Sequence, residues 1–307
     1  MNAHQWLDQK FSGEYFSGKF NHLKNFYQKN KNLFFFETTV VTVAGTNGKG
    51  ETIRAIASQL GNNEKTYALW TSPHIFSVHE RFVFNGDVVE DEQLVRAFET
   101  VQSSLSSQKM SYFEFLFLTF LLLAKEKRPQ YLLIEIGLGG RLDAGNIIDA
   151  DIAVLTSISR DHQEFLGNSY RKILYEKLGI LRRGANLISA LELSYLQCLT
   201  SNYCYRMNVK HKELFKLGIV TKKDSFSMRN QKLAHEVISE LNLETFTFKE
   251  DTACRLKQKY LQTKLFYYPS HNPDGIRKLV HHLSQLKYNN FNYIVISLSN
   301  RSLSDLR

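Results

Sequence analysis

The chain alternates short, continuously apolar runs with longer amphipathic stretches. A continuous apolar run of a few residues predicts a strand that is covered on both faces of its sheet. Such runs occur at residues 38–45 (TTVVTVAG), 67–70 (YALW), 131–137 (YLLIEIG) and 151–155 (DIAVL). Helices are expected at residues 51–60, 91–105 and 115–125. Strands that alternate with helices indicate an α/β fold with a mainly parallel sheet flanked by helices.

Further segments extend this pattern. The first forty residues alternate aromatic and polar positions, and we expect them to be helical. The Asn-Gly inside RFVFNGDVV (81–89) favours a hairpin or a projecting loop. One helix is expected over residues 163–182 and another over 228–241, whereas residues 185–228 show no clear pattern. Beyond residue 264 the sequence predicts a strand, a loop, a helix and a last strand at 293–299.

Composition indicates the class of protein and of partner. Hydrophobic residues make up 43% of the 307 residues, which is enough to bury a full core. This length suits one large domain and a smaller one, and we place them at residues 1–250 and 251–307. The net charge of +9 favours an anionic partner, although scattered Lys and Arg are more typical of a generally basic surface. Because the sequence has no nucleic-acid recognition motif, we expect no nucleic-acid partner.

The cysteines and the apolar runs indicate the cellular compartment. Cys198, Cys204 and Cys254 form no CxxC pair, and an odd number of cysteines argues against a disulfide framework. The N-terminus lacks the basic-then-apolar pattern of a signal peptide. The most apolar run, at residues 115–124, is too short to span a bilayer and predicts a buried core helix. We expect a cytoplasmic monomer with no membrane partner.

Polar or glycine-rich segments follow the first four predicted strands. They are AGTNGKG at 44–50, TSPH at 71–74, Glu135 with GLGGRLDAGN at 137–146, and RDH at 160–162. Ligands of open α/β sheets bind at the carboxyl ends of the strands. The four segments therefore predict one site along that edge.

The glycine loop carries the clearest chemistry. A glycine-rich turn that opens a helix directs backbone N–H groups at a phosphate, and the helix N-terminus adds positive potential. Lys49 stands where it would reach the β- and γ-phosphates. The pattern GxxxxGK[ST] is not met, because its first position falls on Val43 and Gly50 follows the lysine. A plain strand-to-helix turn therefore stays open as an alternative.

Three side chains at the same edge are candidate magnesium ligands. Glu135 ends an apolar strand, where nucleotide-binding sheets place a metal-ligating carboxylate, but a salt-bridging acid is the alternative. His162 is a less usual ligand for this hard ion, and a single histidine is more often structural. Ser72 offers a hydroxyl, yet before Pro73 it equally suits a turn.

Seven motifs occur in the order of one known family: TVAGTNGKG, TSPHIFSVHERFVFNG, YFEFL, IEIGLGGRLDAGNII, TSISRDHQEFLG, EKLGIL and SHNPDG. On these residues the chain resembles the folylpolyglutamate synthase and dihydrofolate synthase enzymes, a branch of the ATP-dependent amide ligases that includes the Mur ligases. The resemblance is dense from Thr42 to Gly184 and thin afterwards. It implies a P-loop-type sheet domain and a small Rossmann-like C-terminal domain, truncated here, that closes over the cleft.

The resemblance also implies a reaction. The family couples ATP hydrolysis to amide formation: a substrate carboxylate attacks the γ-phosphate, and the amino group of glutamate then displaces phosphate from the acyl phosphate. The implied cofactors are ATP and Mg²⁺, and the implied substrates are L-glutamate with dihydropteroate or a folate. The sequence does not decide between the dihydropteroate and the folylpolyglutamate step.

Individual residues acquire roles through the same resemblance. The ATP-binding loop would consist of Gly45, Thr46, Asn47, Gly48, Lys49, Gly50, Glu51 and Thr52, with Asn230 and Arg255 on the far side of the nucleotide. His271, which matches the histidine of the family's C-terminal motif, would also bind ATP. The metal ligands would be Ser72, Glu135 and His162. Lys177 matches a lysine that the family carbamylates to make a metal-binding carboxylate. The implied catalytic residues are thus Lys49, His162, Lys177 and His271.

Three departures from the family pattern leave an alternative open. Glu51 replaces the serine that the family has after GKG, so an acid would repel the phosphates unless Glu51 binds magnesium or Thr52 supplies the hydroxyl. Tyr268 replaces the aspartate of the family's Asp-Gly-Ala-His-Asn-Pro motif. The predicted C-terminal domain is also short. The alternative is a degenerate homologue that binds ATP without ligating.

Overall fold

An eight-stranded sheet organises the computed structural model, which describes residues 1–11, 20–248, 256–260, 263–267, 272, 274–277 and 279–280. The strand order is β4-β3-β2-β5-β1-β6-β7-β8. The parallel strands are β1 (Thr39–Ala44), β2 (Tyr67–Trp70), β5 (Tyr131–Glu135), β6 (Ile152–Leu155), β7 (Asn186–Ser189) and β8 (Lys210–Glu213). At one edge the hairpin β3 (Val83–Phe84) and β4 (Asp87–Val88) pairs antiparallel. The predicted α/β fold and the Asn-Gly hairpin are both confirmed.

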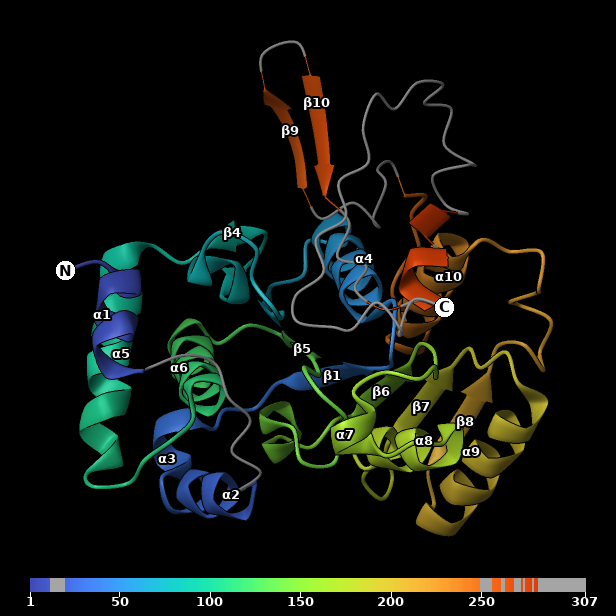
Figure 1. Cartoon of the computed structure of the whole chain (residues 1–307), viewed down its shortest axis with the longest axis horizontal. Helices are drawn as coiled ribbons and strands as arrows, with labels where there is room; N and C mark the ends of the chain where they lie inside the picture. Colours follow the sequence, from blue (N-terminus) through green and yellow to red (C-terminus); the bar gives the residue numbers. More distant parts are fainter. Residues whose placement is uncertain are drawn as a thin grey trace.

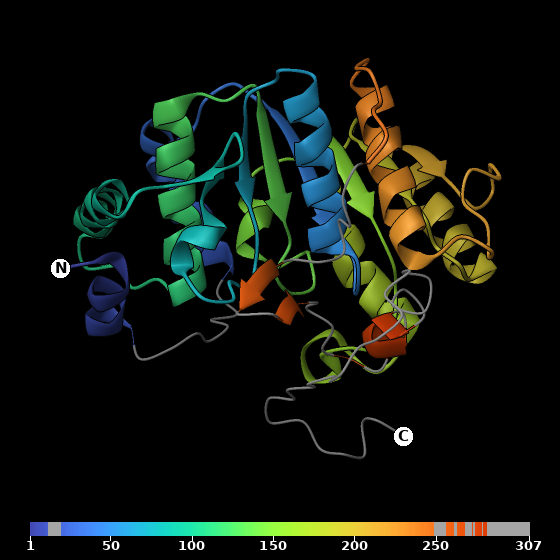
Figure 2. The ribbon, with the colours of Figure 1, turned by 90° about the horizontal axis from the view of Figure 1, so that it is seen from above.

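Helices cover both faces of this sheet (Figure 1). On one face α4 (Lys49–Asn62) and α10 (Phe226–Glu240) bury Ile53, Ile56 and Val237 against Val41 and Val43 of β1. The opposite face carries α6 (Tyr112–Lys127), α8 (Tyr170–Leu178) and α9 (Ser194–Met207). A turned view shows α4 and α10 side by side (Figure 2). The sheet is thus buried on both faces, which explains why its strands are continuously apolar.

The aromatic half of the core surrounds α6. Every residue from Phe115 to Ala124 is buried, as predicted for a core helix. Trp70 of β2 packs edge-on against Phe117, and Trp6 stacks on Phe115. The remaining helices of this side are α1 (Ala3–Lys10), α2 (Phe20–Lys29), α3 (Lys31–Phe34) and α5 (Asp91–Leu105). None of the helices that the structure describes is both long enough and apolar enough to cross a membrane.

Two expectations for the middle of the chain are corrected. The single helix expected over 163–182 is two helices, α7 (Gln163–Leu166) and α8, because Gly167 turns the chain at φ +87° and Ser169 caps α8. Residues 185–228, where no pattern was clear, contain β7, α9 and β8. The next helix, α10, begins at Phe226 because the hydroxyl of Ser225 accepts a hydrogen bond from Met228 N.

An antiparallel pair, β9 (Leu256–Tyr260) and β10 (Thr263–Tyr267), lies apart from the main sheet (Figure 1). The strand expected after residue 264 falls on β10. The strand expected at 293–299 lies outside the described residues. The division into domains at residue 250 stays a prediction.

Candidate functional site

The glycine loop, residues 45–48, joins β1 to α4. Gly48 is the N-cap of α4 at φ +89° and places no side chain on the helix end. A Cβ atom at Gly48 would lie 2.6 Å from Oδ1 of Asn230, so this position requires glycine both for its backbone and for its space. The first N–H groups of any α-helix have no partner within the helix. Together with the helix dipole they make this end of α4 attractive to an anion.

The loop is tied to the segment that follows β6. Thr46 N donates to Ser157 O at 2.8 Å, and Thr46 Oγ1 accepts from Ser159 N at 3.0 Å. Asn47 N donates to Ser157 Oγ at 3.0 Å. Sequence reasoning assigned Ser157 and Ser159 no role, although both belong to the TSISRDH motif. These bonds fix two residues of the loop before any ligand arrives.

Two lysines lie against the loop. Lys49 Nζ donates to Thr46 O at 3.2 Å, and Lys177 Nζ donates to Gly45 O at 2.9 Å. Lys177 is only 4% exposed, and this burial, helped by the positive charge of Lys49, lowers its pKa to about 7. The carboxylates of Asp143 and Asp161 act in the opposite direction. The structure thus places one charged and one partly neutral amine at the predicted phosphate site.

Asp143 is a buried acid of the site that sequence reasoning did not single out. It accepts hydrogen bonds from the backbone N–H groups of Gly137, Leu138 and Gly145 at 2.9–3.0 Å. Burial raises its pKa to about 6, while these bonds and the charge of Lys49 act to lower it. Its place in GLGGRLDAG, between two glycine-rich turns, was the available signal. Asp143 holds the loop after β5 in shape.

The predicted metal ligands are only partly brought together. Glu135 is 5% exposed, its Oε2 accepts from Ser72 N at 3.2 Å, and its Oε1 would lie 3.2 Å from a Cβ on Gly50. Glu135, Ser72 and the start of α4 therefore adjoin one another. His162 follows β6, and β1 lies between β5 and β6 in the sheet.

His162 instead lies with two acids of its own segment. Its ring nitrogens are 3.9 Å from Asp161 and from Glu164. Across the described residues no three His, Cys, Asp or Glu side chains gather in a way that would hold a metal ion. Mg²⁺ commonly uses one or two carboxylates, waters and the phosphates of its substrate. Glu135 with Ser72 fits that donor set, and the metal role of His162 stays a prediction.

Glu51, the unexpected acid, is turned toward α10. Its Oε1 accepts a short hydrogen bond from Ser227 Oγ, and its Oε2 accepts from Asn230 Nδ2 at 2.6 Å. Glu51 is 8% exposed and Asn230 is 1% exposed. Thr52, the alternative hydroxyl, is fully buried, and within the described part of the chain its Oγ1 has no hydrogen-bond partner. The two residues that could have replaced the family's serine thus face the protein interior.

The C-terminal motif SHNPDG reaches the glycine loop. Asn272 Nδ2 donates to Asn47 Oδ1 at 2.9 Å and to Asp161 Oδ2 at 3.0 Å. In return Asn47 Nδ2 donates to Asn272 Oδ1 at 3.2 Å and to Asp274 Oδ2 at 2.9 Å. Arg255, His271 and Tyr268 lie outside the described residues, so their predicted roles stay predictions.

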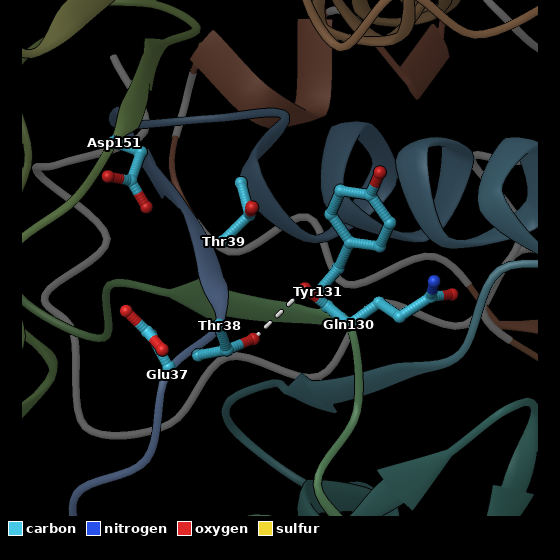
Figure 3. Close-up of a pocket in the computed structure, with 6 residues that line it drawn as sticks. All are labelled: Glu37, Thr38, Thr39, Gln130, Tyr131 and Asp151. Atoms are coloured by element: carbon cyan, nitrogen blue, oxygen red, sulfur yellow. Dashed lines mark hydrogen bonds between the residues drawn. The ribbon is translucent and has the colours of Figure 1, made fainter.

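A hollow at the amino ends of the strands, opposite the glycine loop, does not suit the predicted nucleotide (Figure 3). It is lined by Glu37, Thr38, Thr39, Gln130, Tyr131 and Asp151, at the amino ends of β1 and β5. Asp151 Oδ2 accepts from Val40 N at 2.8 Å, and Thr38 Oγ1 donates to Gln130 O at 3.1 Å. Its charged lining is acidic, so it would repel a nucleotide.

A second, smaller hollow lies at the carboxyl ends of the strands, beside the turn that follows β5. It lies between the GLGGRL turn and α7 and is lined by Leu138, Gly139, Gly140, Leu142, Phe165, Leu166 and Glu176. Phe165 is 57% exposed. An apolar surface with an exposed ring suits a flat aromatic group beside the charged loop.

Comparison with known proteins agrees with this geometry. The model of the Mur ligase middle domain matches residues 43–252. The dihydrofolate synthase/folylpolyglutamate synthase of Buchnera aphidicola (Acyrthosiphon pisum) is 38% identical over 173 residues, which is 56% of this chain and 42% of that protein. The protein of the same name from Escherichia coli K12 is 41% identical over 143 residues, 47% of this chain and 34% of that protein. The chain thus covers less than half the length of these relatives.

Solved structures share the fold. A bifunctional folylpolyglutamate synthase/dihydrofolate synthase from Yersinia pestis CO92 superposes with a TM-score of 0.78 at 22% identity, covering 93% of this chain and 76% of that one. A structure of such an enzyme with Mn, AMPPNP and L-glutamate bound gives a TM-score of 0.75 at 23% identity, covering 92% and 73%.

Proposed function

The chain belongs to the Mur ligase middle-domain family, and from that premise we propose that it is an ATP-dependent amide ligase that joins L-glutamate to dihydropteroate or to a folate. The observation that carries this proposal is the convergence at the N-terminus of α4. A glycine loop without a side-chain cap, two lysines and a buried carboxylate meet there. Curated relatives at 38–41% identity bear the name dihydrofolate synthase/folylpolyglutamate synthase.

The loop would bind the phosphates of ATP. The N–H groups in the first turn of α4, which have no partner within the helix, donate to phosphate oxygens, and Lys49 leaves Thr46 O to neutralise the γ-phosphate. Phosphoryl transfer depends on positioning and charge neutralisation more than on covalent chemistry from the protein. The substrate carboxylate then attacks the γ-phosphorus, the bond to the β,γ-bridging oxygen breaks, and ADP leaves.

A magnesium ion would lie at Glu135 and Ser72, which the structure brings to the start of α4. Bound there, it would offset the charge of the phosphates. Relatives of the fold have been solved with Mn and AMPPNP, in accord with a divalent ion beside the nucleotide.

Lys177 would serve the same site through its partly neutral amine. A pKa of about 7 leaves a large share of the amine unprotonated at neutral pH, and only that form attacks CO₂. The nitrogen then forms a bond to carbon and loses one proton, giving a carbamate with one negative charge. In this way a buried lysine is converted into a carboxylate-like group beside Gly45.

The second substrate would lie against the apolar hollow of the GLGGRL turn. We assign its aromatic ring to the surface that contains Leu138, Leu142 and Phe165. The acyl phosphate then forms between this hollow and the loop, where the amino group of glutamate attacks the carbonyl carbon and phosphate leaves.

A second candidate is ATP binding without ligation. Glu51 favours it, because a carboxylate in the first turn of α4 competes with phosphate for the positive helix end. The two candidates share the nucleotide and differ in turnover.

An ADP-release assay on the full chain separates them. ATP, Mg²⁺ and L-glutamate are supplied, and dihydropteroate or a folate is added in turn. We expect ADP release to require one of the pterin substrates, and the substrate that elicits it identifies the step. Binding of ATP without pterin-dependent release would support the second candidate, and absence of ATP binding would exclude both.

A further inference from the structure

We propose that Glu51 is a positioning residue that fixes the carboxamide of Asn230 over the glycine loop, so that its oxygen accepts a hydrogen bond from a donor group of the nucleotide. This inference rests on the proposed function, because it assigns Asn230 to the nucleotide. It gives a role to Glu51, an acid in the first turn of a helix that would bind phosphate.

The contacts define the orientation. Asn230 Nδ2 donates to Glu51 Oε2 at 2.6 Å, and both side chains are more than nine-tenths buried. A carboxylate accepts hydrogen bonds and cannot donate them, so it selects the NH₂ group of the carboxamide. The oxygen of Asn230 is thereby left for another partner; a Cβ position on Gly48 lies 2.6 Å from this oxygen and 2.9 Å from Nδ2, so the whole carboxamide lies over the loop. Asn230 therefore covers the loop with a defined polarity.

Serine, which the first-turn position has in the resembling family, would not impose this polarity, because a hydroxyl both donates and accepts. With Glu51 in place, the atom that meets Asn230 Oδ1 must be a donor. At neutral pH the phosphates of ATP offer only hydrogen-bond acceptors, whereas the ribose hydroxyls and the N6 amino group of adenine can donate. Glu51 thus assigns Asn230 to the nucleoside part of ATP rather than to its phosphates.

Ser227 holds the other oxygen of the Glu51 carboxylate. Its hydroxyl donates to Glu51 Oε1, one turn of α10 before Asn230. The carboxylate consequently joins α4 to two positions of α10. Ser227 provides a control, because its loss loosens the joint between the helices and leaves the bond between Glu51 and Asn230 in place.

The first measurement uses the chain without ligand. Glu51→Gln, Asn230→Ala and the double variant are unfolded in urea. We expect the loss in midpoint caused by Glu51→Gln to be much smaller in the Asn230→Ala background, because the shared contact is already gone. Equal losses in the two backgrounds would show that the two side chains do not depend on each other and would overturn the proposal.

The second measurement is calorimetric titration of the same variants with ATP and Mg²⁺. We expect Glu51→Gln to weaken ATP binding about tenfold when Asn230 is present, and not to weaken it when residue 230 is alanine. Removing the charge from the first turn would even strengthen binding a few-fold in that background. Glu92→Gln, a matched change of an exposed acid in the first turn of α5, should leave affinity unchanged.

Three analogues that lack the N6 amino, the 2′-hydroxyl or the 3′-hydroxyl group identify the donor. One of them should bind equally to the wild type and to Glu51→Gln. Equal loss for ATP and all three analogues would contradict the assignment to a donor group. A weakening by Glu51→Gln that persists in the Asn230→Ala background and follows the Mg²⁺ concentration would mark Glu51 as a metal ligand instead.

Ser227→Ala separates positioning from mere packing. It should lower the urea midpoint and change ATP affinity less than twofold. If Ser227→Ala lost as much ATP affinity as Glu51→Gln, Glu51 would act only by joining α4 to α10, and the proposal would be overturned. If the wild type bound no ATP while the urea experiment showed coupling, the contact would stand, and both the proposed function and the nucleotide role of Glu51 would fall.

Discussion

The carboxyl ends of β5 and of β8 each carry a buried glutamate, yet their surroundings differ. Glu135 ends β5 and is 5% exposed, and Glu213 ends β8 and is 4% exposed. Glu135 accepts from Ser72 N and faces the first turn of α4, where backbone donors have no partner within the helix. Glu213 belongs to a closed hydrogen-bonded chain. The same residue type at equivalent strand ends thus has two different environments.

The closed chain near β8 links four polar side chains to Glu213. Lys216 Nζ donates to Ser201 Oγ at 3.3 Å, and Ser201 Oγ lies 3.3 Å from His211 Nδ1. His211 Nε2 is 2.8 Å from Ser189 Oγ, whose hydroxyl donates to Glu213 Oε2 at 2.5 Å. This order assigns the ring proton of His211 to Nε2. Burial lowers the pKa of His211 to about 4 and raises that of Glu213 to about 7.

Displaced pKa values therefore do not by themselves locate the site. Lys177 near the loop and Glu213 near β8 are displaced to similar values by the same cause, burial. The difference lies in what remains for a ligand: the loop end offers donors at a helix terminus, and the β8 end has bonded its donors to its own acceptors. Backbone donors at a helix terminus, rather than a shifted pKa, distinguish the binding site from a rigid polar core.

The largest expected effect comes from making the same change at both strand ends. Glu135→Gln should lower ligase turnover about a hundredfold or more and raise the Mg²⁺ concentration required, because a metal held by Glu135 and Ser72 would lose the carboxylate of that pair. Glu213→Gln should retain turnover within about twofold, since β8 is the edge strand of the sheet and three strands separate it from β5. ADP release measured across a Mg²⁺ series checks both. Equal losses in the two variants would remove the distinction between the two ends.

Replacing one lysine at each of the two strand ends tests the same comparison by ATP affinity. Lys49→Ala should weaken ATP binding by roughly one to two decades, because charge-assisted bonds to phosphate are worth about 1.5–3 kcal/mol. Lys216→Ala removes an exposed lysine of the closed chain and should leave ATP affinity unchanged. Calorimetric titration with ATP and Mg²⁺ measures both. Unchanged affinity in Lys49→Ala would refute its assignment to the phosphates.

The smallest expected effect is a pH-dependent stability difference at Lys177. Its folded pKa of about 7 lies below the ordinary 10.5, so between these values the unfolded chain binds more protons and the free energy of unfolding rises with pH. Relative to Lys177→Met, the wild type should therefore gain about 2 kcal/mol between pH 7 and pH 9. Urea unfolding at both pH values checks this.

Lys172→Met is the control for that experiment, because Lys172 is exposed on the same helix, α8. Its difference from the wild type should not vary between pH 7 and pH 9. A Lys177→Met difference that is equally flat would mean that the amine is charged in the folded protein throughout this range.

Most of the sheet could be predicted from the sequence because its strands are buried on both faces. β1, β2, β5 and β6 are continuously apolar, and the predicted resemblance to the folylpolyglutamate synthase and dihydrofolate synthase enzymes is confirmed by the comparisons. β8 escaped prediction because KHKE, at the sheet edge, is polar and only partly buried. Its place in the sheet is set by pairing with β7, which leaves no periodic signal.

The site was only partly predictable for a related reason. The loop, Lys49 and Lys177 belong to local motifs, and both lysines donate to carbonyl groups of the loop. The neighbours of Glu51 and Asn47 come from residues about 180 and 225 positions away, and no local pattern indicates them. The separation of Glu135 from His162 is likewise not local information, since β5 and β6 follow one another in the chain whereas the sheet inserts β1 between them.

The contact between Asn47 and Asn272 imposes an order on folding during synthesis. Asn47 leaves the ribosome early, and 225 further residues must be added before Asn272 exists to bond to it. At about 5–20 residues per second that interval lasts roughly 10–45 seconds. The sheet around β1, β5 and β6 can assemble within it, because its strands are complete by Leu155. Until then the glycine loop would be held by earlier residues, among them Ser157, Ser159 and Lys177, and a nascent chain that binds nucleotide would do so before Asn272 arrives.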